Sequence, residues 1–118
     1  MSQLIVANVM NEEKKIELEY FFDVSQKMLA LAKNKDWEKL PELEVDRQKV
    51  MHSFFESEDS DHYLSINSDK VEHTIKNVLL INEQIEKIAQ KEQLVIGQEL
   101  QGLKKKQNAH SAYLENNK

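Results

Sequence analysis

The stretch NKDWEKLPELEVDRQKVM, residues 34–51, holds the chain's one tryptophan and its one proline. The letters around Trp37 and Pro41 are otherwise typical of plain helix. A proline just past the first turn lacks the N–H that would bond the carbonyl four residues earlier. We therefore predict a loosened opening turn over 36–40 with regular helix from Pro41, and we expect the Trp37 ring to cover the end of the preceding helix.

Two helices flank this corner. Apolar residues at three- and four-residue spacing predict a first helix over about 11–34 and a second over about 37–56. In the first helix these residues are Phe21, Val24, Met28 and Leu31, and in the second they are Trp37, Leu40, Leu43, Val50 and Phe54. Arg47 takes one place in the second stripe. Because the connector is only Asn34 and Lys35, the two helices are expected to be antiparallel neighbours.

A third helix is predicted over about 60–102. Its heptad phase runs through Leu64, Val71, Ile75, Val78, Ile85 and Ala89, with Ser68 and Asn82 filling two places. Gly97 and Gly102 favour a bend or fray, because glycine weakens a helix. A short C-terminal helix or tail over about 104–118 is then expected. The first two helices are too short to cover the third, so part of its apolar stripe should be open to a partner.

Composition supports one all-α domain over residues 1–118, an antiparallel bundle of three to four helices. The chain has 118 residues with two glycines, no cysteine and a net charge of −5. Tight turns need glycine and proline, which are scarce here. The acidic balance argues against direct nucleic-acid binding. Neither a membrane span nor a signal peptide is recognised, so a cytoplasmic protein is expected.

No residue pattern predicts an enzyme, a metal site or a cofactor. The four histidines form no HExxH pair. Asp59 and His62 have one spacing used by diiron bundles, but a second copy is missing. The acidic stretch ESEDSD, residues 56–61, lacks the glycine of a calcium loop and is expected to be a connector. Arg47 and Asn82 are interpreted as core polar groups that fix helix register.

The corner resembles the FliT family of flagellar export chaperones. The resemblance rests on Leu31-Ala32, on Trp37 with the spacing W-x-x-L-x-x-L-E-x-x-R-x-x-V, and on three later segments. These segments are Ile75-Lys76, Ile81-Asn82-Glu83-Gln84-Ile85 and the tail from Asn108 to Tyr113. The chain departs from the enteric pattern in the loop over 56–61 and in its short tail.

The resemblance implies a helical chaperone that binds the C-terminal amphipathic segment of the filament cap protein in the cytosol. It implies delivery to the flagellar type III export apparatus, with the export ATPase and a flagellar transcriptional regulator as further partners. The residues predicted to bind the partner are Ile81, Ile85, Ile88, Val95, Ile96, Leu100, Tyr113 and Leu114. Those predicted to be structural are Trp37, Leu40, Leu43 and Arg47. The segment from Asn108 is expected to compete for the same groove.

Two other functions stay open on the sequence alone. The first is a homodimeric coiled-coil adaptor or regulator whose exposed stripe pairs with itself. The second is a metal-binding helical bundle enzyme. Mass measured against concentration separates the chaperone from the adaptor, and metal analysis of the purified protein tests the enzyme.

Overall fold

The computed structural model describes residues 2–58 and 60–116, with side chains over 12–58 and 60–115. Four helical elements account for nearly all of these residues: α1 (Ser2–Lys33), the 3-10 helix η1 (Trp37–Lys39), α2 (Leu40–Glu56) and α3 (Ser60–Asn116). No strand occurs in the described ranges. The predicted all-α class is confirmed.

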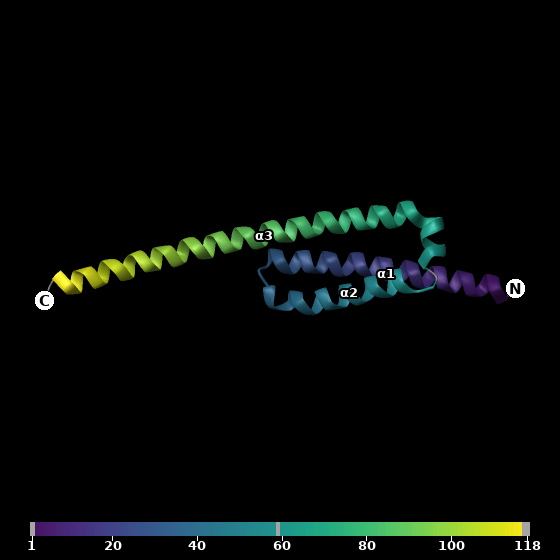
Figure 1. Cartoon of the computed structure of the whole chain (residues 1–118), viewed down its shortest axis with the longest axis horizontal. Helices are drawn as coiled ribbons and strands as arrows, with labels where there is room; N and C mark the ends of the chain where they lie inside the picture. Colours follow the sequence, from purple (N-terminus) through teal and green to yellow (C-terminus); the bar gives the residue numbers. More distant parts are fainter. Residues whose placement is uncertain (1, 59, 117–118) are drawn as a thin grey trace. The chain divides into compact units, whose positions relative to one another are not determined.

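The chain divides into two compact units, Met1–Ile85 and Glu86–Lys118. Unit 1 contains α1, η1, α2 and the first part of α3. Within it, α1 and α2 lie side by side as an antiparallel hairpin, as Figure 1 shows. Unit 2 consists of the second part of α3.

The corner between α1 and α2 is held by backbone hydrogen bonds. The N–H groups of residues 34, 35 and 36 donate to the carbonyls of Ala30, Ala32 and Leu31 at 3.1, 3.0 and 2.9 Å. These bonds satisfy carbonyls that the end of α1 leaves unpaired. Lys35 adopts a left-handed conformation with φ of 62°, which lets the three residues between α1 and η1 reverse the chain.

The predicted loosened turn before Pro41 is confirmed. The segment 37–39 forms η1, and α2 begins at Leu40. Pro41 therefore lies in the first turn of α2, where its missing N–H would have no helical partner in any case. The proline marks the start of a helix here and does not interrupt one.

The Trp37 ring is half-buried and not fully enclosed. Its Nε1 atom is nevertheless buried, and it has no hydrogen-bond partner among the described residues. A buried donor without a partner lowers stability. Packing of the Trp37 ring therefore stabilises this corner, whereas its unpaired N–H group destabilises it.

We expect Trp37→Ala to lower the free energy of unfolding by about 2 kcal/mol, because roughly half of a large ring loses its packing. Trp37→Phe should cost clearly less, since it keeps an aromatic ring and removes the unpaired N–H. Urea denaturation followed by circular dichroism measures both. Equal losses for the two variants would show that the indole N–H is satisfied in solution.

The core of unit 1 is centred on Phe54. Buried side chains from all three helices meet there: Leu18, Phe54, Tyr63 and Val71. The partly buried Leu64 and Ile75 pack against them. The rings of Phe54 and Tyr63 pack edge to face with centroids 5.7 Å apart, a favourable aromatic geometry. Burial raises the pKa of Tyr63, and the nearby carboxylates of Glu19 and Glu12 raise it further.

One carbonyl joins α1, α2 and α3 in this core. Lys14 of α1 is 3% exposed, and its Nζ donates to the carbonyls of Ser53 and Phe54 at 3.0 and 3.1 Å. Ser60 at the start of α3 donates its hydroxyl to the same Phe54 carbonyl. The last turn of α2 is thus capped by a cation and a hydroxyl from two other helices.

Helix α3 begins at Ser60, as the sequence predicted, and has one internal irregularity. Asn67 leaves helical geometry with φ −119° and ψ 26°, and its Nδ2 donates to the Tyr63 carbonyl at 3.2 Å. The first turns of α3 consequently run in a different direction from the turns that follow Asn67 in unit 1 (Figure 1).

Two predicted boundaries differ from the structure. Helix α1 begins at Ser2 and not near 11, and α3 continues through Gly97 and Gly102 to Asn116 instead of ending near 102. Glycine in a helix interior costs only about 1 kcal/mol relative to alanine. The helix formers on both sides of each glycine are enough to carry the helix through. A Cβ built on either glycine would meet no atom within 4 Å.

Candidate functional site

The interior of unit 1 contains a polar network centred on Arg47 of α2. Its Nη1 donates to Asn82 Oδ1 of α3 at 2.7 Å and to Ser25 Oγ of α1 at 3.3 Å. Its Nη2 donates to Glu44 Oε2 at 2.5 Å. Ser25 Oγ itself donates to the Phe21 carbonyl at 2.8 Å. The guanidinium therefore links all three helices.

The Arg47 side chain is 11% exposed, so the pairing takes place largely out of water. Charged hydrogen bonds are stronger there, and leaving either partner unpaired is costly. The two polar residues that the sequence placed inside apolar stripes, Arg47 and Asn82, are thus bonded to each other. Such a contact favours one longitudinal register of α3 against α2.

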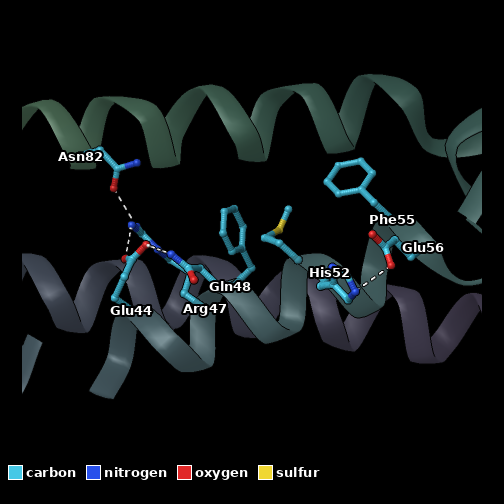
Figure 2. Close-up of a pocket in the computed structure, with 9 residues that line it drawn as sticks. Glu44, Arg47, Gln48, His52, Phe55, Glu56 and Asn82 are labelled. Atoms are coloured by element: carbon cyan, nitrogen blue, oxygen red, sulfur yellow. Dashed lines mark hydrogen bonds and ion pairs between the residues drawn. The ribbon is translucent and has the colours of Figure 1, made fainter. Parts of the chain in front are cut away.

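An open pocket of about 460 Å³ lies beside this network. Its lining residues are Phe21, Glu44, Arg47, Gln48, Met51, His52, Phe55, Glu56 and Asn82. Figure 2 shows Arg47 reaching toward Asn82 at one end, with His52, Glu56 and Phe55 at the other. Both apolar and polar side chains line the pocket, as is common in binding recesses.

Two close polar contacts lie along the pocket. Arg47 pairs with Glu44, and His52 Nε2 lies 2.7 Å from Glu56 Oε2. The His52 and Glu56 side chains are exposed, so this contact contributes little to stability. Among the described residues, no group of three His, Cys, Asp or Glu side chains is placed to hold a metal ion.

The second part of α3 carries apolar side chains that are exposed. Val95, Ile96, Leu100 and Leu103 are 39%, 45%, 60% and 62% exposed. We call these four residues the unit 2 stripe. Ile96, Leu100 and Leu103 are four and three residues apart, so they share one helix face. Val95 lies roughly 105° to one side of that face. Leu94 is also exposed, but it points roughly 150° away from that face.

The eight predicted partner-binding residues fall into three groups. Ile81 is buried in unit 1 at 9% exposure. Ile85 and Ile88 are half-buried. The others are exposed: Val95, Ile96, Leu100, Tyr113 and Leu114. The four predicted structural residues, Trp37, Leu40, Leu43 and Arg47, are all half-buried.

Several residues of these sites were missing from the sequence-based prediction. Leu103 completes the unit 2 stripe, and Phe21, Met51 and Phe55 line the pocket. The burial of Lys14 was also missed. A signal for Lys14 does exist, because it lies four residues before Leu18 and seven before Phe21. It therefore occupies the buried face of α1.

The model of a family described as flagellar protein FliT matches residues 17–116. The chain belongs to the FliT family. The resemblance noted at the corner and around Asn82 is thereby confirmed. The FliT match extends over the second half of α1, all of η1 and α2, and α3 to Asn116, so it includes both the pocket and the unit 2 stripe.

No curated protein and no solved structure shows a significant match to this FliT-family chain. In the part of the chain that the structure describes, no helix has the length and apolar character needed to cross a bilayer.

Proposed function

We propose that this chain is a flagellar export chaperone. It would hold the C-terminal amphipathic segment of the filament cap protein in the cytoplasm, prevent premature assembly and deliver the subunit to the type III export apparatus. Membership of a flagellar protein family supports the setting. Such a chaperone makes and breaks no covalent bond, and it requires no cofactor.

The observation that carries the proposal is the exposure of the unit 2 stripe. A row of exposed apolar residues on one helix face is a typical partner surface. An amphipathic client helix can pack its own apolar face on such a row, in the manner of helix-in-groove recognition. The stripe runs from Val95 to Leu103, roughly 12 Å along the helix axis. The stripe alone would contact a client segment of a few turns. The half-buried Ile85 of unit 1 and Ile88 of unit 2 are proposed as further contacts.

We expect Ile96→Asp and Leu100→Asp each to weaken binding of the cap protein's C-terminal segment roughly tenfold to a hundredfold. Each variant removes an apolar contact worth about 1.5–3 kcal/mol when buried. Both residues are exposed in the free chain, so helicity and thermal unfolding should change little. Calorimetric titration with the segment encoded in the same genome measures the affinity, and circular dichroism checks the fold.

Leu94→Asp is the matched control. It makes the same change at a residue that is 63% exposed, but on another face of the same helix. Its affinity for the segment should stay close to that of the unmodified chain. A loss equal to that of Ile96→Asp would show that the stripe does not determine the contact.

Ile81 is assigned to the core in this proposal, because it is buried in unit 1. Tyr113 and Leu114 lie ten or more residues beyond Leu103 and are proposed as outlying contacts for a longer client segment. The export ATPase and a flagellar transcriptional regulator are proposed as later partners of the chaperone.

The rival proposal is a homodimeric adaptor without a client, since the same exposed stripe can pair with a second copy. Sedimentation equilibrium over a range of concentrations separates the two. A chaperone that self-associates through the stripe should return to monomer when the client segment is added. A dimer that persists with saturating segment would favour the adaptor.

A further inference from the structure

Three lysines directly after the unit 2 stripe are arranged with a definite geometry around it. Lys104, Lys105 and Lys106 are all exposed and lie within α3. At 100° per residue, Lys104 lies roughly 75° to one side of the line through Ile96, Leu100 and Leu103, and Lys106 roughly 85° to the other. Lys105 points roughly 170° away from that line. Two ammonium groups thus flank the end of the apolar row.

The flank that carries Lys106 has the opposite charge toward the N-terminal end of the stripe. Glu99 is exposed and lies roughly 65° from the line, on the side of Lys106. One flank therefore presents a carboxylate two turns before an ammonium group. The edges of this surface have a polarity along the helix axis, acidic first and basic last.

The net charge of the segment around the stripe is positive, like that of the three lysines. Residues 86–118 contain six lysines and four glutamates, a net charge of +2. The whole chain carries −5, so residues 1–85 carry −7. A partner attracted to unit 2 by its field would be acidic, and the same partner would be repelled by the strongly acidic remainder of the chain.

We propose that the unit 2 stripe binds an amphipathic helix whose apolar face is flanked by carboxylates at one end. Lys104 and Lys106 pair with these carboxylates and so set the direction in which the bound helix lies. The inference rests on the proposed function, because it assumes that the stripe holds a partner. It adds the chemistry and the orientation of that partner. Ion pairs at the edge of an apolar contact fix register and direction more than they add affinity.

A protein helix fits this surface better than an anionic membrane does. Lysines beside an apolar row are also found on helices that lie on membranes. Glu99, however, would approach the lipid phosphates together with the stripe, where its carboxylate is repelled. A partner helix can place a cation or a hydrogen-bond donor opposite Glu99 and a carboxylate opposite Lys104, which a uniform anionic surface cannot do.

The test uses the full chain and two synthetic 18-residue helical peptides that differ only in charge. Both carry the same leucine face on an alanine and glutamine background. The acidic probe has glutamates flanking that face at one end, and the basic probe has lysines at the same places. In calorimetric titration at low salt, the acidic probe should bind about tenfold more tightly than the basic one, the sum expected of two edge ion pairs.

The Lys104→Glu/Lys106→Glu double variant should reverse this preference. Lys105→Glu, which makes the same change on the far face of the helix, should leave it in place. Raising the salt concentration should reduce the preference, because exposed charges are screened. Equal affinities for the two probes, including no binding of either, overturn the inference. Loss of the preference in Lys105→Glu to the same degree as in the double variant also overturns it.

Two further measurements separate this inference from its alternatives. If the chain sediments with phosphatidylserine vesicles through Lys104 and Lys106 while showing no preference between the probes, the surface binds membranes and the inference is wrong. If the acidic probe is preferred but the cap segment does not bind, the proposed client is wrong and the inference stands. If the cap segment binds equally to the double variant, the inference fails and the proposed function stands.

Discussion

Phe54→Ala is expected to lower the free energy of unfolding by about 3–5 kcal/mol, the usual cost of emptying a fully buried aromatic site. Phe54 has no exposed surface, and its ring touches residues from α1 and α3 as well as its own helix. Its removal leaves a cavity in a cluster to which all three helices of unit 1 contribute. Urea denaturation followed by circular dichroism measures the loss.

The neighbouring residue supplies the control. Phe55 is 44% exposed and packs its ring edge to face on Phe54 at 5.0 Å. Phe55→Ala removes the same atoms from a site that water already reaches, and we expect a loss of about 1 kcal/mol. If the two alanine variants were equally unstable, the burial pattern of the α2 C-terminus would be wrong.

Arg47→Met is expected to lower the free energy of unfolding by about 2–3 kcal/mol. The substitution keeps much of the side-chain length but removes the donors to Asn82, Ser25 and Glu44. A buried acceptor that loses its charged donor retains the cost of leaving water. Denaturation at constant pH, with matched slopes against urea, measures the change.

The double variant Arg47→Met/Asn82→Leu separates the value of the bond from the cost of breaking it. Replacing both partners with apolar groups removes the unpaired acceptor, so the double variant should be more stable than Arg47→Met alone. A double variant that loses the full sum of the two single losses would show that Arg47 and Asn82 act independently. Such additivity is not expected of residues 2.7 Å apart.

The hairpin corner was predictable from sequence because its chemistry is local. Pro41 favours a helix that begins next to it, and a connector of only a few residues makes the next helix antiparallel to α1. The beginning of α3 at Ser60 followed from apolar periodicity, which kept its phase back to Leu64. The places of Arg47 and Asn82 inside otherwise apolar stripes indicated two core polar groups, but not their hydrogen bond to each other. All of these signals depend on a few neighbouring residues.

The remaining features depend on energy differences that a pattern does not measure. Whether Gly97 and Gly102 end a helix depends on the summed propensity of the residues around them, and here the helix continues. The burial of Lys14 depends on carbonyls 39 and 40 residues away. The stripe of α3 looks alike at Ile81 and Ile96, but one residue is buried and the other exposed. The spacing of apolar residues identifies which face of a helix is apolar, but it does not show whether another helix packs against that face.

The two glycines of unit 2 bear on how firmly a partner is held. Gly97 and Gly102 stand within the segment that carries the unit 2 stripe, and alanine would fit sterically at both. Each glycine leaves this segment less preorganised as a helix than alanine would. Ordering it on binding offsets part of the contact energy, which lowers the lifetime of the complex without altering its contacts. Under the proposed function, such a surface would recognise the client through side chains and still let it dissociate readily, as delivery to the export apparatus would require.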